Sequence, residues 1–199
     1  MVMRQTYQAK MRKIILYTSL LAIVSCGKTA EMEEESVEGS SVYAFSFVGT
    51  SYEIVKENKT WTDAVSFAVA RGGYLSEINS EEEQNAVFLE LTTKAGIVLD
   101  ETNNEFGYAA VWLGGNDLAE EGSWVWNGDN EESGVAFWIG GVDGSAVNGL
   151  YNNWGNEPDN NGDQDALCIG LEATPINSAG KWTDLDGNKN QLHFVIEYD

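Results

Sequence analysis

The segment Trp154-Gly-Asn-Glu-Pro-Asp-Asn-Asn-Gly-Asp-Gln-Asp165 decides how this chain is interpreted. It is dense in side chains that carry hard oxygen atoms, and Pro158 stands between its first two acids. Calcium binds about six to eight oxygen atoms from carboxylates, amide carbonyls and water, so the composition of the segment indicates a calcium site. The oxygen-bearing residues are Asn156, Glu157, Asp159, Asn160, Asn161, Asp163, Gln164 and Asp165.

The competing interpretation is an ordinary solvated loop, because Asn, Asp, Gly and Pro are also the residues of turns. A second polar cluster, Trp182–Asn190, favours a site built from two loops. Two runs that start at Asp159 and Asp184 imitate the start of an EF-hand loop. Their glycine stands at position four in place of six, and no Glu follows at position twelve. An EF-hand is therefore excluded.

One folded domain is expected, because 199 residues with 43% apolar side chains suffice for a single core. The formal net charge is -21. Such an acidic body repels nucleic acid and anionic lipid, so a nucleic-acid partner is excluded. Metal ions and cationic ligands remain compatible with the charge.

Residues 1–25 are predicted to be a lipoprotein signal peptide and not part of the fold. Ile14–Val24 is an apolar stretch of eleven residues, too short to span a bilayer. Ile23-Val24-Ser25-Cys26 resembles the bacterial lipobox, so we expect lipidation of Cys26; a plain secretory signal with an incidental cysteine is the alternative. The true start is Met1 or Met11, and the basic residues before the apolar stretch are Arg4, Lys10, Arg12 and Lys13.

Residues 26–41 are predicted to be an acidic, flexible tether, because they are too polar to be buried. An acidic run after a lipidated cysteine resembles the surface-export signals of some Gram-negative lipoproteins. A solvated linker that carries no export signal explains the acidic run equally well. The expected location is a bacterial membrane, the outer membrane or cell surface, with the lipid anchor as the only membrane contact.

Beyond residue 41 the pattern predicts an α+β fold, with helices first and strands afterwards. A first helix is expected over Thr60–Ala70, capped by Thr60 and ended by Gly72-Gly73. Ser80-Glu-Glu-Glu83 is a capping box that opens a second helix, whose Val87, Phe88 and Leu91 should be buried. The expected buried face of the first helix is Trp61, Ala64, Val65, Ala68 and Val69; strands are expected at 43–55, 74–78, 111–113, 124–126, 166–171 and 194–198.

Five motifs occur along the chain in a specific order: Trp61-Thr-Asp-Ala64, Gly72-Gly-Tyr-Leu75 with Ser80–Glu83, Val111-Trp-Leu-Gly-Gly115, Trp154–Asp159 and Trp182-Thr-Asp184. In this order they resemble the C-type lectin-like domain, over about residues 42–199. The resemblance implies that the N- and C-terminal strands pair, that two helices flank small antiparallel sheets, and that a long loop carries calcium and sugar. It also implies a cis peptide bond at Pro158.

The resemblance also implies a ligand set. Glu157 and Asp159 match the two ligands that flank the proline, and Gln164 matches the later glutamate ligand, with Asp165 as the alternative. Thr183 and Asp184 match the Asn-Asp pair after the core tryptophan. The expected calcium ligands are Glu157, Asp159, Gln164 and Asp184; the same residues with Thr183 are the expected carbohydrate-binding set.

The chain departs from the family pattern at this set. Mannose-type sites read Glu, Asn, Glu, Asn, Asp, and this chain reads Glu, Asp, Gln, Thr, Asp, with three acids in both. The unchanged number of acids favours a retained ion, while the hydroxyl of Thr183 is a poorer ligand than an amide carbonyl. Glu-Pro-Asp matches neither the mannose nor the galactose type. Both usual disulfides are absent, with Ala166 and Ile196 near expected cysteine positions.

Several conspicuous residues have ordinary interpretations. His193, the single histidine, is expected to be structural, because no nucleophile motif accompanies it. Cys168 is expected to be a small buried residue. Trp61, Trp112, Trp154 and Trp182 sit in core motifs, whereas Trp124, Trp126 and Trp138 are candidates for stacking on sugar.

Three functions remain after the sequence is read. The first is a lipid-anchored module that binds a glycan through Ca2+. The second is a lectin-like domain that binds a protein, as an adhesin or assembly component, without calcium-dependent sugar binding. The third is a glycosidase with paired carboxylates, which is disfavoured because no catalytic pair or hydrolase motif is present, so no enzyme activity is expected.

Overall fold

The computed structural model describes residues 41–199 except 102, 103, 105, 106, 130, 132 and 160. The predicted signal peptide, Cys26 and nearly all of the tether therefore lie outside the described residues. The described residues belong to one compact unit. None of the helices in the described part of the chain is long and apolar enough to cross a membrane.

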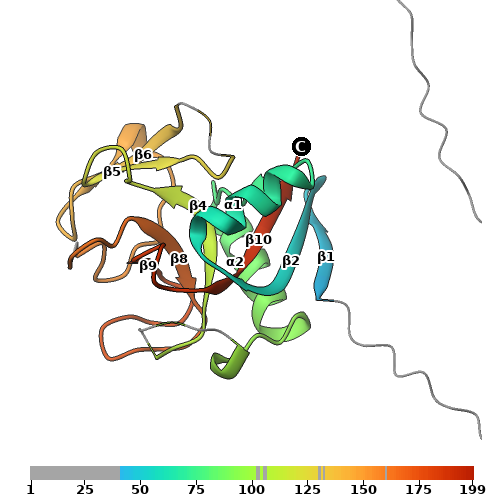
Figure 1. Cartoon of the computed structure of the whole chain (residues 1–199). Coiled ribbons are helices and arrows are strands. Elements are labelled where there is room, and N and C mark those ends of the chain that lie inside the picture. Colours follow the sequence, from blue (N-terminus) through green and yellow to red (C-terminus); the bar gives the residue numbers. More distant parts are fainter. Residues whose placement is uncertain (1–40, 102–103, 105–106, 130, 132, 160) are drawn as a thin grey trace, which may run out of the picture. The chain divides into compact units, whose positions relative to one another are not determined.

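The described chain forms two main helices beside one connected sheet, which confirms the predicted α+β class (Figure 1). The strands run in the order β1-β2-β10-β4-β5-β6-β7, with β3 on β10, β8 on β4 and β9 on β8. The bounds are β1 Val42–Phe47, β2 Thr50–Lys59, α1 Trp61–Ala70, β3 Tyr74–Leu75, α2 Glu81–Leu89, β4 Ala110–Asn116, β5 Ser123–Trp126, β6 Val135–Ile139, β7 Ser145–Ala146, β8 Ala166–Gly170, β9 Trp182–Leu185 and β10 Leu192–Tyr198.

The N- and C-terminal strands pair, as the motif series implied. β1 and β2 form an antiparallel hairpin whose turn residues Val48 and Gly49 both have positive φ. β10 then pairs antiparallel with β2, and its residues His193 and Phe194 pair in parallel with β4. The last strand, β10, thus lies between β2 of the N-terminal hairpin and β4, while β1 forms the edge of the sheet (Figure 1).

Helix α1 has the predicted cap and most of its predicted face. The Thr60 side chain accepts a hydrogen bond from the Asp63 backbone N–H at 3.2 Å, and Gly72 follows with positive φ. Trp61 is buried, and its indole N–H donates to the carbonyl of Leu113, which ties the helix to β4. The expectation for Val69 was wrong: this side chain is 47% exposed, because the buried stripe is narrower than the spacing suggested.

Helix α2 begins at the predicted cap, because the Ser80 hydroxyl accepts from the Glu83 backbone N–H. The Glu83 carboxylate does not close the usual capping box but accepts from Asn79 N–H and from the hydroxyl of Tyr52. Val87 is buried as expected. Leu91 is also buried, although it lies in the short π-helix Glu90–Lys94 that continues α2.

The core beside β9 is built from aromatic side chains, and two candidates for sugar stacking belong to it. Trp124 and Trp126 were candidates for sugar stacking, but both are buried, with exposed fractions of 1% and 3%. They pack with Phe137 and with the two tryptophans of the core motifs, Trp154 and Trp182. Their hydrophobic area therefore stabilises the fold and is unavailable to a ligand.

Trp138 remains half-buried, and its indole N–H donates to the Gly140 carbonyl. Cys168 is buried in β8, as expected, and is the free cysteine of the described residues. His193 is buried within β10 among structural residues. Ala166 and Ile196, the positions near expected cysteines, are both buried apolar residues that pack in the core.

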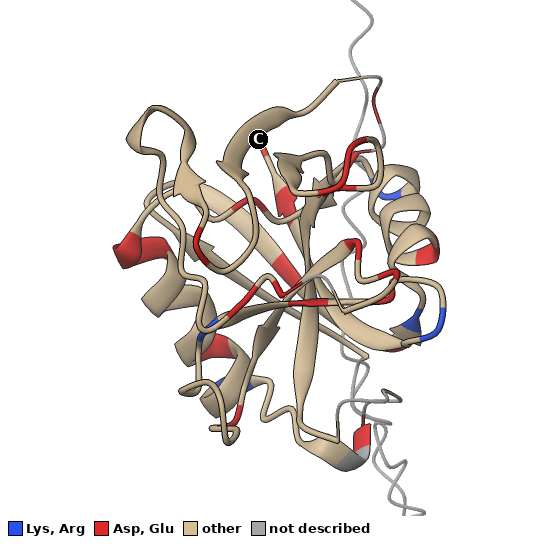
Figure 2. Cartoon of the chain, turned by 90° about the vertical axis from the view of Figure 1, so that its left-hand side faces the viewer, with Lys and Arg blue, Asp and Glu red and all other residues tan. Residues whose placement is uncertain are grey.

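Asp and Glu positions, in red, recur along the ribbon in the view of Figure 2, whereas Lys and Arg positions, in blue, are few. Two further acids lie together before α2: Glu197 is buried, Glu77 is half-buried, and the Glu77 backbone N–H donates to the Glu197 carboxylate. Burial raises the pKa of Glu77 to about 7, with added repulsion from Asp129 and Asp199. Burial also raises the pKa of Glu197 to about 7, and the repulsion of Glu83 and Glu77 adds to it.

These two carboxyls predict a pH dependence of stability without calcium. A carboxyl whose folded pKa is raised stabilises the fold below its unfolded pKa, near 4.5, and loses this contribution as pH rises through about 7. Buried His193, whose pKa is lowered by burial, opposes this by destabilising the fold in acid. Because the carboxyls with raised pKa values outnumber this one histidine, we expect the urea midpoint in EDTA to fall between pH 5.5 and pH 8.

The matched variant for this prediction is Glu197→Gln. The amide keeps the shape of the side chain but cannot ionise, so the fall of the urea midpoint between pH 5.5 and pH 8 should become smaller. Exposed Glu120, which lies outside this group, provides the control Glu120→Gln. An equal fall in all three proteins would show that Glu197 does not titrate in this range.

Candidate functional site

Strand β9 and the Trp154–Asp165 loop meet at the backbone level. Trp154 forms an isolated parallel bridge with Trp182, and the Trp182 backbone N–H donates to the Asn153 carbonyl at 3.0 Å. β9 is in turn held by β8, where Leu167 pairs with Asp184 and Cys168 with Thr183. Together these pairings place Thr183 and Asp184 beside the segment that carries the Glu-Pro-Asp motif.

On its other side the loop is fixed where Gly155 lies against the side chain of Asn177. A Cβ on Gly155 would lie 1.8 Å from the side-chain oxygen of Asn177, so only glycine allows this approach. The same Asn177 oxygen accepts from the Asn156 backbone N–H at 2.7 Å. The residue before Glu157 is therefore anchored to the 172–180 loop.

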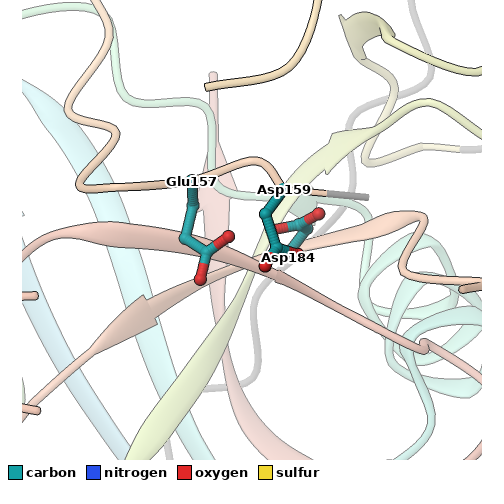
Figure 3. Close-up of side chains that lie close together, drawn as sticks. All are labelled: Glu157, Asp159 and Asp184. Carbon is teal, nitrogen blue, oxygen red and sulfur yellow. The ribbon is translucent and has the colours of Figure 1, made fainter. Parts of the chain in front are cut away.

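Three carboxylates converge at the junction. One oxygen from each of Glu157, Asp159 and Asp184 lies within 4.8 Å of the others (Figure 3). The Glu157-Pro158 peptide bond is cis, as the resemblance implied. Like charges at this separation repel one another unless a cation or protons compensate them. The sequence thus identified all three members of this group.

Two oxygen atoms at the site fit a bound metal ion. Glu157 and Thr183 are almost fully buried, with exposed fractions of 4% and 2%. Glu157 Oε2 and Thr183 Oγ1 form no hydrogen bond of ordinary geometry among the described residues. Burial, and then the charge of Asp159, raise the pKa of the Glu157 carboxyl. Buried oxygens without partners are costly, and a hard cation would satisfy them.

The remaining candidates lie next to Asp159. Gln164 Oε1 and Asp159 Oδ1 both accept a hydrogen bond from the Asn161 backbone N–H, at 3.0 and 3.1 Å. The side chain of Gln164 therefore adjoins the carboxylate group. The alternative ligand is Asp165, whose backbone carbonyl accepts a hydrogen bond from the Asp117 N–H at 3.2 Å. Burial and the charge of Glu121 raise the pKa of its carboxyl.

A further acid that sequence reasoning missed adjoins the loop. Asp117 follows β4, is 2% exposed, and accepts from the Gly122 backbone N–H at 2.8 Å. Burial, Glu121 and Asp165 raise its pKa to about 7. The sequence analysis gave Asp117 no role, because no metal-ligand or catalytic motif surrounds it. The pairing of β4 with β8 brings it to the loop, and that pairing is visible only in the fold.

A cavity of about 360 Å³ opens between the two loops. It is lined by polar residues of both, including Asn161, Gln164 and Asn190. Lys189 also lines it and forms an ion pair with Asp186 at 2.6 Å. The site is thus a polar depression beside a carboxylate group, suited to a small hydroxylated ligand rather than an apolar one.

The chain matches the family model described as the lectin C-type domain over residues 57–195. It is 32% identical over 121 residues to C-type lectin domain family 4 member M of Nomascus concolor, covering 60% of this chain and 23% of that protein. It is 28% identical over 145 residues to a perlucin-like protein of Mytilus galloprovincialis, covering 72% and 73%. The chain thus spans about a quarter of the first relative's length.

Solved structures share the fold. The carbohydrate-recognition domain of the mouse scavenger receptor C-type lectin superposes with a TM-score of 0.53 at 24% identity, covering 78% of this chain and 93% of that one. The carbohydrate-recognition domain of cow CD23 gives a TM-score of 0.52 at 21% identity, covering 77% and 91%. At these identities the likeness concerns the fold alone.

Proposed function

This chain belongs to the family of C-type lectin domains, and from that premise we propose that it binds a glycan through Ca2+ in the Glu-Pro-Asp loop. The observation that carries the proposal is the convergence of three carboxylates beside buried oxygens without partners. The family is typically non-enzymatic, and the proposed role requires no chemical step.

Each residue has a role in this proposal. Glu157, Asp159, Gln164 and Asp184 would hold the ion, and bound calcium would supply coordination positions for two neighbouring sugar hydroxyls. Glu157 and Asp159 accept hydrogen bonds from the hydroxyls of the ligand, because an ionised carboxylate is an acceptor only. Gln164 and Thr183 can donate to the ligand oxygens. The buried pairing of β9 with β8 keeps Thr183 and Asp184 in place before the ligand arrives.

The proposal extends to location. The lipobox-like run ending at Cys26 supports a lipid-anchored protein of a bacterial membrane, displayed at the cell surface on the acidic 26–41 tether. Sugar binding by one shallow site is weak, and clustering of anchored copies would supply avidity. Metabolic labelling with a fatty-acid probe, compared with Cys26→Ser, tests this part separately.

The alternative is a protein partner bound without calcium. It predicts binding that survives EDTA, whereas the glycan proposal predicts binding that EDTA abolishes. The experiment is chromatography of the chain on agarose that carries immobilised mannose or galactose, loaded in calcium and eluted with EDTA.

We expect calcium-dependent retention on at least one sugar. Asp159→Ala should lose it, because the variant removes a predicted ligand of the ion and an acceptor of the sugar. Asp163→Asn is the control, since Asp163 lies in the same loop but outside the three-carboxylate group. Passage of the parent chain through a panel of sugar columns without retention would contradict the glycan proposal and favour the protein partner.

A further inference from the structure

Strand β1 forms one edge of the sheet, and no strand in the described part of the chain pairs with its outer side (Figure 1). In the ladder between β1 and β2, the Lys56 N–H donates to the Ser41 carbonyl. Hydrogen-bonded and non-hydrogen-bonded pairs alternate in an antiparallel ladder, so the odd-numbered residues of β1 direct their backbone groups to β2. The backbone N–H and C=O groups of Ala44 and Ser46 therefore point outward from the sheet.

This edge lacks the features that usually prevent edge strands from pairing with another chain. Those features are charged side chains, proline and bulges. β1 has the sequence Val-Tyr-Ala-Phe-Ser-Phe and pairs with β2 without a bulge. No charged residue occurs between positions 39 and 52, although 22% of the chain is charged. Ala44 and Ser46 are small and exposed, so neither blocks the approach of a second strand.

The turn after β1 carries a residue that the fold alone does not explain. Val48 has a φ of 46°, and this left-handed conformation is unfavourable for a β-branched side chain. Asn and Gly are the usual residues in such turns. The Val48 side chain is also 87% exposed, so it buries almost no apolar surface within the described residues. An unfavourable conformation without a contact that offsets it indicates a contact outside this chain.

We propose that two copies of this chain pair through β1, in antiparallel orientation and related by a two-fold axis at Phe45. In this register Ala44 lies opposite Ser46 of the second copy, so the outward N–H and C=O groups of both residues gain partners. The register also uses the whole length of β1 in both copies. It brings Val48 next to Val42 of the second copy, which gives the exposed valine an apolar contact.

A second copy is the expected occupant of this edge for three reasons. Antiparallel pairing of a strand with itself is isologous, so each favourable contact is made twice. Copies with a net charge of -21 repel one another, and an uncharged edge is where they approach with the least repulsion. The preceding residues 26–41 are acidic and poor in strand-forming residues, so they are not expected to cover β1 themselves.

The test is oxidative cross-linking of the full chain in membranes of cells that express it, because cross-linking traps a small and weak contact. Opposite residues of a hydrogen-bonded antiparallel pair have Cα atoms about 5.5 Å apart, which a disulfide spans. Ala44→Cys and Ser46→Cys chains expressed together should therefore give a cross-linked dimer. Either variant alone should give at least about fivefold less, because two identical positions lie on a longer diagonal. The parent chain, whose Cys168 is buried, is the blank.

A pair of charged variants separates strand pairing from general repulsion. Ala44→Lys combined with Ser46→Lys places like charges opposite each other. Co-isolation of two differently tagged full chains should then fall at least about fivefold, although the net charge becomes less negative. Ala44→Lys combined with Ser46→Glu places opposite charges at the same positions and should keep the co-isolation. Both side chains are exposed, so both variants should melt at the temperature of the parent chain.

Three outcomes would overturn the proposed pairing. Failure of the mixed cysteine chains to cross-link would show that the copies do not meet at β1. Equal cross-linking by a single cysteine variant would exclude the two-fold register. Equal loss of co-isolation in the Lys-Lys and Lys-Glu chains would show that opposite charges do not meet across the edge. None of these results bears on calcium-dependent glycan binding, which involves other residues.

Discussion

Saturating calcium is expected to raise the melting temperature of this chain by about 5–10 °C over its value in EDTA. A ligand that binds only the folded state stabilises it by about 2.7 kcal/mol at a hundredfold excess over the dissociation constant. For a domain of this size each kcal/mol corresponds to about 2–4 °C. The three carboxylates, with one oxygen of each within 4.8 Å of the others, give the ion a site present only in the fold.

Asp184→Asn should abolish this calcium response, because it removes one of the three charges without changing the shape of the side chain. In EDTA the same variant should be no less stable than the parent chain, since it relieves repulsion from Glu157 and Asp159. Differential scanning fluorimetry with a calcium titration measures both effects. Asp163→Asn, outside the group, should respond to calcium as the parent does.

A calcium response of equal size in Asp184→Asn would place the ion elsewhere. The carboxyls of Asp117 and Asp165 would then be the group to change, because burial and the nearby charge of Glu121 raise the pKa of both beside the same loop. No response of the parent chain at millimolar calcium would contradict the calcium mechanism itself.

Trp182→Ala is expected to destabilise the fold by about 3–5 kcal/mol, the usual cost of removing a buried large aromatic side chain. Trp182 has an exposed fraction of 0% and is in edge-to-face contact with Trp126, Phe137 and Trp154. Its indole N–H donates to Gln84 Oε1 at 2.8 Å, so the variant also leaves a buried amide without its partner.

Urea denaturation in EDTA measures this loss directly. With a slope of about 1–3 kcal/mol per molar urea, the midpoint should fall by at least about 1 M. Trp138→Ala is the control, because Trp138 is half-buried and its indole N–H bonds only nearby glycine carbonyls. A similar loss in both variants would contradict the larger contribution to stability that burial gives Trp182.

The calcium response should also weaken in Trp182→Ala. Trp182 is the first residue of β9, directly before Thr183 and Asp184, and bridges to Trp154 at the start of the loop. A variant that retained full calcium stabilisation after losing this contact would show that the site is assembled independently of the aromatic core.

The sequence by itself determined the elements with short-range causes. Thr60 and Ser80 cap the two helices because their hydroxyls reach the N–H three residues along. The density of acids and amides in Trp154–Asp165 marked the loop, and the order of motifs identified the α+β fold. These features depend on neighbours in the chain, so periodicity and composition were enough to predict them.

Only the tertiary structure decided the features that depend on distant parts of the chain. Trp124 and Trp126 resembled exposed platforms, yet the contacts of β5 with β6, Trp154 and Trp182 bury them. Asp117 had no assigned role in the sequence, and the pairing of β4 with β8 places it against the loop. Pairing between strands that are distant in the sequence decides which side chains are buried. It also decides which acids become neighbours in space, and the residues next to Asp117 in the sequence do not indicate this.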